Sequence, residues 1–397
     1  MRLGHKPRVL ITHQGCVPIY RRPFFDRLAR SPHIDYVIAV GDPPRGTDYM
    51  TAQPPYAFQT LPIQNYELPL GGKTVIWQPL VSTYWKEFDA VVLGEELKYI
   101  SHFALAAISK MRGRPFVWWG FGVPRWEVSA KKSTVVRRPL SEFVSHHLRR
   151  QASGYLSYTK SGRDRMQQDG FDGDKIAVLN NVVDIEAQRD FRAAVANESD
   201  ADIRKRLGVA PDVPVLIYFG RFLTAKCVDV LLRYALRRRE MGAPICALIS
   251  GSGFEENNLH TLAAGSPDIV FNKLDDTDLA RALKISKAIV IPGFVGLAVT
   301  HGFAHGVPMI TREGVHPPEI EYLEHGANGL LLPEDEQLFF QGLDAFLASP
   351  ELQAKLSAGA EHSAANLTMD AMAERFDGLM QQVLARAGRT ELSPIAP

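Results

Sequence analysis

The sequence predicts an α/β protein with two domains, each built on a largely parallel sheet. Short apolar runs alternate with longer amphipathic stretches along the chain, which is the pattern of βαβ units. The alternation occurs twice, and a polar, charged stretch at residues 185–212 separates the two series. The length of 397 residues also exceeds what one ordinary hydrophobic core accommodates.

The first series defines a domain over residues 1–184, and the second defines a domain over residues 213–365. Strands of the first domain are expected at residues 9–12, 36–40, 90–93, 116–119, 154–157 and 176–178. Strands of the second are expected at residues 215–219, 245–250, 269–271, 288–291, 308–310 and 329–332. We interpret residues 185–212 as a linker with a helical piece. Residues 366–397 contain a helix of period 3.6 from Met369 to Arg386, which we expect to cross back to the first domain. Together these elements predict two Rossmann-like domains that face a central cleft.

Bulk composition indicates an ordinary soluble protein and argues against nucleic-acid binding. The chain is 46% hydrophobic and has a formal net charge of only +1, whereas a nucleic-acid-binding domain is usually strongly basic. Its three cysteines lack metal-site spacing, and their odd number suits a reducing compartment. No apolar run approaches the length of a membrane span or a secretory signal. We therefore expect a cytoplasmic protein, soluble or peripheral to the inner face of a membrane.

Ligands on parallel α/β sheets bind beyond the carboxyl ends of the strands. The first such loop contains Gly15, followed by Arg21 and Arg22. A glycine here lets backbone amides approach a phosphate or a sugar closely. The alternative is a plain turn with solvated arginines, and the spacing alone does not separate the two.

The loop after residues 215–219 carries the strongest signal. Gly220 opens it, and Arg221 and Lys226 follow at a spacing of five. Two cations at the end of a strand suit a diphosphate. The alternative is a surface loop with solvated charges.

Two further glycine-containing loops follow later strands. Gly251 and Gly253 form a Gly-Ser-Gly turn, which is weak evidence alone because flexible connections look the same. The amides of Gly296, Leu297 and Ala298 open a predicted helix and form an expected anion site.

Three residues near that helix are interpreted separately. His301 lies about one turn into the helix and could reach a ribose, although an isolated histidine is more often a buried residue bonded to a carbonyl. We expect His305 on the helix surface. We interpret Glu319, which follows two prolines, as a structural carboxylate at a helix start.

Taken in chain order, these segments resemble the retaining GT-B glycosyltransferases of group 1, which include sucrose synthase and the phosphatidylinositol mannosyltransferases. The resemblance is strongest over residues 218–332, where GRFLTAKCVDVLL, GSGFE and GLAVTHGFAHGVPMI resemble the family's donor-binding segments. LNNVVD at residues 179–184 resembles the end of the family's acceptor domain, and VPIYRRPFF resembles bacterial surface-polysaccharide members.

The resemblance implies a hexosyltransferase-type enzyme of bacterial glycan, glycolipid or polysaccharide biosynthesis. A nucleoside-diphosphate sugar would be its donor substrate, and a glycan, glycolipid or small molecule its acceptor, without a further cofactor. Arg221 and Lys226 would hold the diphosphate and stabilise the leaving group, and Gly15 would approach the donor or acceptor from the other domain.

The chain also departs from the family. Most members carry two glutamates eight positions apart, and Gly293 and His301 occupy those positions here. Cys227 replaces a glycine. A neutral imidazole can still contact a ribose, since it accepts one hydrogen bond and donates another. The missing glutamate at position 293 leaves the contact to the donor sugar unassigned and puts retention in doubt.

Catalysis by such a site would rest on stabilising the diphosphate that leaves. We expect no metal, and we interpret Asp275 and Asp276 as a solvated turn. His13 and Glu95, each after a first-domain strand, are the candidate general bases.

Three questions stay open at this stage. Residues 130–151 carry six Lys or Arg against one Glu, so they could contact an anionic membrane or form a solvated helix face. The alternative functions are a nucleotide-sugar epimerase or another GT-B enzyme, and a degenerate protein that binds a nucleotide sugar or glycan without turnover.

Overall fold

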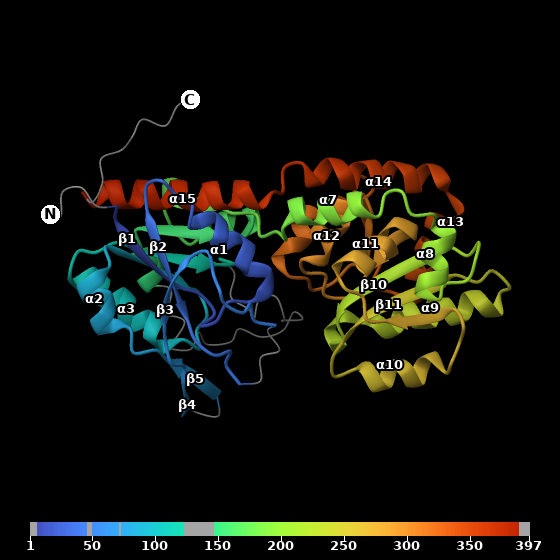
Figure 1. Ribbon diagram of the computed structural model, residues 1–397, viewed down its shortest axis with the longest axis horizontal. Helices are drawn as coiled ribbons and strands as arrows, with labels where there is room; N and C mark the ends of the chain where they lie inside the picture. The colour runs from blue at the N-terminus through green and yellow to red at the C-terminus, as the bar shows by residue number, and fades with distance from the viewer. Residues whose placement is uncertain (1–5, 46–49, 71–72, 123–146, 389–397) are drawn as a thin grey trace. The chain divides into compact units, whose positions relative to one another are not determined.

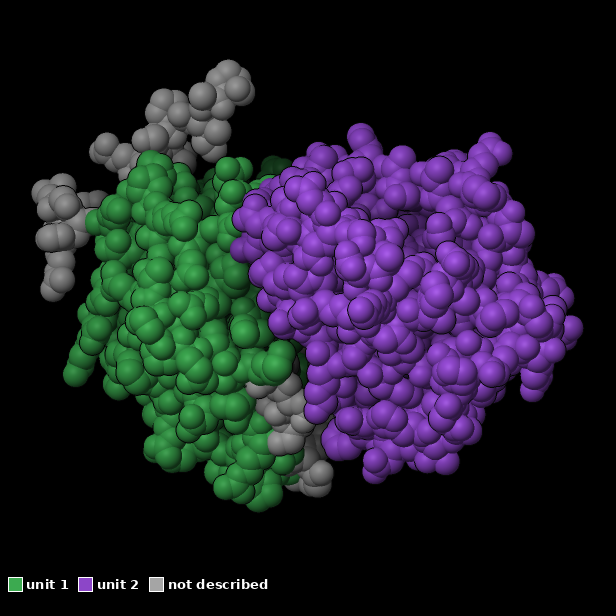
Figure 2. Space-filling view, turned by 45° about the vertical axis from the view of Figure 1, so that its right-hand side comes forward, with its two compact units in different colours: residues 1–181, 369–397 green, residues 182–368 purple. Residues whose placement is uncertain are grey.

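The computed structural model describes residues 6–45, 50–70, 73–122 and 147–388. The chain divides into two compact units, residues 1–181 with 369–397 and residues 182–368, which Figure 2 draws in different colours. Each unit contains one parallel sheet with helices packed on it (Figure 1). The predicted α/β class, with one parallel sheet in each of two domains, is therefore confirmed.

The first unit is built on a seven-stranded parallel sheet of order β3-β2-β1-β6-β7-β8-β9. Its sheet strands are β1 (Arg8–Thr12), β2 (Asp35–Val40), β3 (Gln59–Pro62), β6 (Ala90–Gly94), β7 (Phe116–Gly120), β8 (Gly154–Ser157) and β9 (Ile176–Val178). Its helices include α1 (Arg22–Leu28), α2 (Val81–Glu87), α3 (Ile100–Met111), α6 (Lys160–Gln168) and α15 (Met369–Arg386), with short 3-10 turns η1 (Ile19–Arg21) and η2 (Gly173–Lys175). Strands β6 and β7 are buried at every position, as strands covered on both faces should be.

Two features of this unit were not predicted. The edge strand β3 was missed, and so was an antiparallel hairpin of β4 (Tyr66–Leu70) and β5 (Lys73–Trp77). β3 and β4 are mostly exposed, so neither shows the apolar run from which we identified the other strands.

The second unit is built on a six-stranded parallel sheet of order β12-β11-β10-β13-β14-β15. Its strands are β10 (Val215–Arg221), β11 (Cys246–Ser252), β12 (Ile269–Asn272), β13 (Ser286–Val290), β14 (Met309–Arg312) and β15 (Gly329–Leu332). Its helices include α7 (Ile185–Ala194), α8 (Asp200–Leu207), α9 (Val228–Glu240), α10 (Glu256–Ala263), α11 (Asp276–Ile285), α12 (Ala298–His305), α13 (Glu336–Ala348) and α14 (Pro350–Ala364), with 3-10 turns η3 (Thr224–Lys226) and η4 (Pro318–Tyr322).

The segment that we interpreted as a linker forms two helices of the second unit. Asp184 caps α7 by accepting the amide of Ala187, and Ser199 caps α8 by accepting the amide of Asp202. α7 packs on α11 and α12, and α8 packs on α11. Residues 185–212 are polar on their outer faces because they are surface helices rather than a free connection.

Helix α15 belongs to the first unit although it follows the second unit in the sequence. It packs on α1, β8 and β9. The Phe376 ring lies 5.4 Å from those of Phe24 and Trp119, and the Asp377 carboxylate accepts a hydrogen bond of 2.8 Å from the Tyr36 hydroxyl. Among the described residues, no helix is both long and apolar enough to cross a membrane.

Candidate functional site

The loops after β10, β11 and β13 meet at one edge of the second sheet. β10 lies between β11 and β13, and all three strands are parallel. Gly220 pairs in register with Gly251, and Arg221 pairs with Ser252. The sheet therefore brings together residues that the sequence predicted for one donor site.

Lys226 reaches from η3 to the start of α12. Its Nζ atom donates a hydrogen bond of 2.8 Å to the carbonyl oxygen of Val295. A Cβ atom placed on Gly296 would lie 3.7 Å from the same nitrogen. The ammonium group thus lies beside the backbone that opens α12. Arg221, at the end of β10, is exposed.

Burial lowers the pKa of Lys226 from its ordinary value to about 8. The positive charge of Arg221 lowers this pKa further, and the carboxylate of Glu319 opposes the shift. The amine is therefore still mostly charged at pH 7. A dianionic ligand would stabilise the charged form.

The start of α12 has the geometry of an anion site. Gly296 has a φ of +70°, and no side chain of the described residues caps the helix at Leu297. The first amides of the helix therefore keep their donor capacity, and the helix dipole adds a partial positive charge.

His301 lies on α12 as a neutral imidazole. Burial lowers its pKa to about 4, and its ring packs edge-on against Phe219 at 5.6 Å. Within the described part of the chain, Nδ1 is buried and has no hydrogen-bond partner. An imidazole in this state can both donate and accept a hydrogen bond, as contact with a ribose requires.

Gly293 is fixed by a close backbone contact. A Cβ atom at this position would lie 2.2 Å from the carbonyl oxygen of Ala225, and the amide of Phe294 donates to that same oxygen at 2.8 Å. A side chain at position 293 would require η3 to move. The glutamate of most family members therefore has no room in this backbone arrangement.

The Gly-Ser-Gly turn packs against the loop that carries Arg221. A Cβ atom on Gly251 would lie 1.8 Å from the carbonyl oxygen of Gly220, and one on Gly253 would lie 2.5 Å from that of Phe222. Both glycines have a positive φ. Their predicted contact with a donor stays a prediction, and close packing of two loops already explains why they are glycines.

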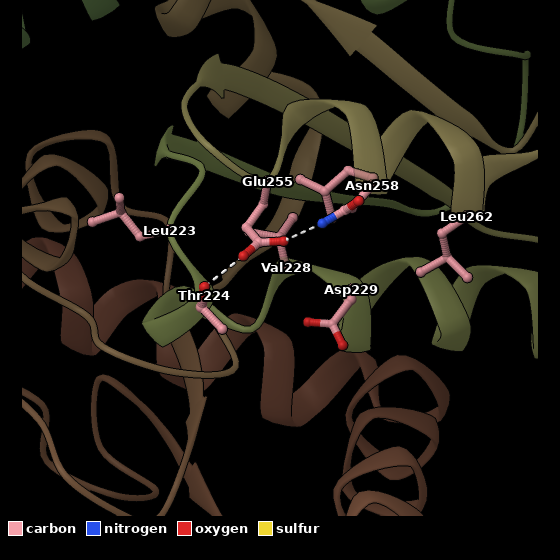
Figure 3. Close-up of a pocket in the computed structure, with 8 residues that line it drawn as sticks. Leu223, Thr224, Val228, Asp229, Glu255, Asn258 and Leu262 are labelled. Atoms are coloured by element: carbon pink, nitrogen blue, oxygen red, sulfur yellow. Dashed lines mark hydrogen bonds between the residues drawn. The ribbon is translucent and has the colours of Figure 1, made fainter.

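A cavity of about 270 Å³ lies between the starts of α9 and α10 (Figure 3). Its lining consists of Leu223, Thr224, Val228, Asp229, Glu255, Asn258, Leu259 and Leu262. Figure 3 shows the Glu255 carboxylate accepting hydrogen bonds from Thr224 and Asn258. Since neither Arg221 nor Lys226 lines it, this cavity is separate from the cationic groups of the predicted donor site.

His13 follows β1 and is enclosed by aromatic side chains. Only 4% of its surface is exposed, its ring stacks on Trp119 at 4.1 Å, and Nε2 lies 3.0 Å from the Tyr158 hydroxyl. Burial, assisted by the charge of Arg21, holds its pKa well below the usual range, so the imidazole is neutral. The imidazole can accept a proton, but its Nε2 atom already lies within hydrogen-bond distance of the Tyr158 hydroxyl.

Glu95 follows β6 and is engaged by three donors. Its carboxylate lies 2.5 Å from Nε of Arg149 and accepts hydrogen bonds from the Tyr155 hydroxyl and from the amide of Gly122. The side chain lies against Gly120, where a Cβ atom would collide with it. As a general base, Glu95 would first have to give up these partners.

Gly15 and Arg21 have structural surroundings that the sequence did not reveal. Gly15 has a φ of +66°, and a Cβ there would lie 2.9 Å from the Gln78 side chain. Our alternative of a solvated Arg21 is wrong: 2% of its surface is exposed, and it donates to the Asn181 side chain at 3.0 Å. The guanidinium also lies 5.1 Å from the Trp119 ring.

Two other interpretations are corrected by the structure. His305 is buried rather than on the helix surface, because α7 covers it and Gln188 lies 3.3 Å from its Nε2. Asp275 is a helix cap, since its carboxylate accepts the amide of Asp278 at 2.7 Å. Within the described ranges, no group of three or more acidic, histidine or cysteine side chains could hold a metal ion. Residues 130–146 of the basic stretch lie outside the described residues.

Glu319 was assigned only a structural role from the sequence. It lies in the first turn of η4 and is 4% exposed, and its negative charge raises the pKa of Lys226. No spacing links it to Lys226 in the sequence, since the two are 93 positions apart.

Comparison of this fold with solved structures defines its class. HepE of Anabaena in complex with UDP matches with a TM-score of 0.67 at 16% identity, covering 95% of this chain and 100% of that chain. Sucrose-phosphate synthase of Thermosynechococcus elongatus also matches with a TM-score of 0.67 at 16% identity, covering 96% and 100%. The protein therefore has the GT-B fold, as predicted.

The similarity to a known family lies mainly in the second unit. Residues 199–363 match the family described as "Glycosyl transferases group 1". A D-inositol 3-phosphate glycosyltransferase of Streptomyces bingchenggensis is 29% identical over 53% of this chain and 50% of that protein. The alpha-D-kanosaminyltransferase of Streptomyces kanamyceticus is 21% identical over 62% of this chain and 65% of that protein. The match of residues 199–363 to this family confirms the predicted family resemblance. The match to the D-inositol 3-phosphate glycosyltransferase spans about half of that relative's length.

Proposed function

We propose that this protein is a glycosyltransferase of the hexosyltransferase type. It moves a sugar from a nucleoside-diphosphate sugar to an acceptor hydroxyl, with retention. The observation that carries this proposal is the Lys226 ammonium beside the opening turn of α12. The match of residues 199–363 to the group 1 family supports it.

We assign different parts of the reaction to different residues of the site. The acceptor oxygen forms a bond to the anomeric carbon while the bond from that carbon to the diphosphate oxygen breaks. Arg221, Lys226 and the amides of Gly296, Leu297 and Ala298 stabilise the charge that develops on the diphosphate. His301 contacts the ribose, and Gly15, Gly220, Gly251 and Gly253 let the backbone approach the substrates.

The acceptor proton goes to a general base or to the leaving phosphate. His13 is neutral at pH 7 because burial and Arg21 depress its pKa, which leaves it able to take a proton. Glu95 is our second candidate base. It acts only if Arg149 and Tyr155 release its carboxylate.

UDP is the nucleotide that we favour. HepE, which shares the fold, was crystallised with UDP and with UDP-glucose. We place the reaction in bacterial glycan, glycolipid or polysaccharide biosynthesis, on the cytoplasmic side. Residues 130–151 would contact the inner face of the membrane if the acceptor is lipid-linked.

A second candidate is a binding protein without turnover. The contact between Gly293 and Ala225 favours it, because position 293 cannot carry the glutamate of most family members. Such a protein would bind the same nucleotide sugar through the same cations. It would release no nucleoside diphosphate when an acceptor is added.

Thermal unfolding against UDP, GDP, dTDP, CMP and ADP tests the proposal, with Arg221→Ala as the paired variant. A ligand at about 100 times its Kd adds roughly 2.7 kcal/mol to the unfolding free energy. We expect UDP to stabilise the wild type but not the variant. If no nucleotide stabilises the wild type at millimolar concentration, the proposal is wrong. Incubation with the matching nucleotide sugars and added acceptors then separates transfer from epimerisation and from binding alone.

A further inference from the structure

The β4–β5 hairpin ends at its base in two amide side chains. Asn65 directly precedes β4, and Gln78 directly follows β5 (Figure 1). Tyr66 and Trp77 pair across these antiparallel strands, so the two amides occupy the next position of the same ladder. The Gln78 Nε2 atom donates a hydrogen bond of 2.8 Å to the Asn65 Oδ1 atom. The base of the hairpin therefore carries a bonded pair of amides.

This amide pair lies directly against Gly15. The Asn65 Nδ2 atom donates hydrogen bonds to the carbonyl oxygens of Gly15 at 3.2 Å and of Asp42 at 2.7 Å. A Cβ atom on Gly15 would lie 2.9 Å from the Gln78 Nε2 atom and 3.0 Å from the amide nitrogen and oxygen of Asn65. A side chain at position 15 would therefore have to displace the pair.

Further hydrogen bonds hold the turn that contains Gly15. The Tyr99 hydroxyl donates to the carbonyl oxygen of Gln14 at 2.7 Å, and the amide of Gly41 donates to that of Gly15 at 2.9 Å. Gln14 and Gly15 have φ values of +59° and +66°. This left-handed region is unfavourable for a residue with a side chain, such as Gln14, and persists where the surroundings hold it. The turn therefore depends on its neighbours for its conformation.

Gln78 is costly as a purely structural residue. Its side chain is completely buried, and its Oε1 atom accepts no hydrogen bond from the described residues. Burying an amide with an unpaired oxygen lowers stability, and an apolar side chain of similar size would fill the same space without that cost. The amide is better explained by its hydrogen bond to Asn65, and so by the turn that Asn65 holds.

We propose that Asn65 and Gln78 are positioning residues, which hold the Gly15 turn in the conformation that sugar transfer requires. Gln78 orients the Asn65 amide, and Asn65 binds the Gly15 carbonyl, which fixes the direction of the adjoining peptide groups. This inference rests on the proposed function, in which Gly15 lets the backbone approach the substrates. In this role neither amide contacts a substrate, and both act through Gly15.

The first test measures the turn without any nucleotide. Hydrogen–deuterium exchange of the peptide that spans residues 13–20, read by mass spectrometry, is compared in the wild type, Gln78→Met and Asn65→Ala. Gln64→Met is the matched control, because Gln64 is an exposed amide next to Asn65. We expect exchange to be about fivefold faster in the first two variants and unchanged in the control, since one hydrogen bond contributes about that factor to local opening. Thermal unfolding checks that each variant is folded.

The second test measures release of UDP from UDP-glucose, with water as the acceptor, beside calorimetric titration with UDP. A turn displaced by about 1 Å should lower kcat of Gln78→Met about a hundredfold. UDP affinity should stay unchanged, because the cations that we propose for the diphosphate belong to the second unit. Gly15→Ala should lower kcat as well, and the two losses should not multiply in the double variant, because both act on one turn. Losses that multiply would show that Gln78 does not act through Gly15.

The outcomes separate this inference from the proposed function. Unchanged exchange in Gln78→Met and Asn65→Ala overturns the inference, whether or not UDP binds. Faster exchange with an unchanged kcat also overturns it, because the pair would then hold the turn without any effect on transfer. A wild type that releases no UDP overturns the proposed transfer, and with it the role of the pair. Faster exchange, a lower kcat and an unchanged UDP affinity support both.

Discussion

At Gly293, the structure and the family resemblance make opposite predictions. The resemblance suggests that Gly293→Glu would restore a missing contact to the donor sugar. In the structure, a Cβ atom there would lie 2.2 Å from the Ala225 oxygen and 2.9 Å from the Lys226 carbonyl carbon. Both atoms belong to the backbone of η3, which cannot swing away as the end of a flexible side chain does. We therefore expect Gly293→Glu to damage the site.

The size of the effect follows from the overlap. A normal contact between these atoms requires a displacement of about 1 Å, and overpacking of this kind costs about 1–3 kcal/mol. For a unit the size of residues 182–368, each kcal/mol lowers Tm by about 2–4 °C, so a cost of about 2 kcal/mol corresponds to about 4–8 °C. Because η3 carries Lys226, the same displacement should weaken UDP binding by at least about tenfold.

The assay is thermal unfolding together with calorimetric UDP titration of Gly293→Ala and Gly293→Glu. Gly378→Ala is the matched control, because Gly378 lies inside α15 and a Cβ there meets nothing within 4 Å. That control should gain about 0.5–1 kcal/mol of stability. A Gly293→Glu variant that unfolds at the wild-type temperature and transfers sugar faster would refute this reasoning.

The other predictions concern three charged residues. Lys226→Met should weaken UDP binding about tenfold to a hundredfold at pH 7, and calorimetry should show no change for Lys287→Met on an exposed position. In the wild type, UDP affinity should fall as the pH rises through about 8, because the protonated amine is the binding form, and Lys226→Met should lack that fall. Asp275→Ala should lose about 1 kcal/mol in urea unfolding and leave UDP affinity unchanged, because its carboxylate caps α11. Glu95→Gln should lose about 1–3 kcal/mol, because Arg149 loses the negative charge that it pairs with and one of the two acceptor oxygens is replaced by an NH2 group; unchanged stability with abolished transfer would instead identify Glu95 as the base.

Strands buried on both faces were predictable because their sequences are continuous apolar runs. Every strand of the second sheet was located to within a few residues for this reason. The strands β3 and β4 were not located, because most of their side chains are exposed to water and their sequences therefore lack a continuous apolar run. Likewise, the helices at residues 185–212 looked like a linker because only one face of each meets the unit.

Loops at strand ends could be located, but the neighbours of their side chains could not. Sequence placed Arg221, Lys226 and Gly296 at one edge, because parallel strands end together. It could not show that Arg21 is enclosed by Trp119 and bonded to Asn181, because those contacts join segments up to 160 positions apart. The prediction that His305 is exposed was wrong for the same reason. Gln188, which lies on α7 and far away in the sequence, covers a position that the helical period alone would leave exposed.

The departure from the family at position 293 has a consequence for donor recognition. A carboxylate at 293 would need space that the backbone of η3 occupies, so a contact to the sugar ring has to come from elsewhere. Arg221 and Lys226, which we propose for the diphosphate, stand at the positions that the family resemblance implies for it. Donor nucleotide recognition should therefore follow the family more closely than donor sugar recognition does. UDP alone should bind nearly as tightly as any UDP-hexose, and a UDP-hexose that binds more than about tenfold tighter than UDP would contradict this.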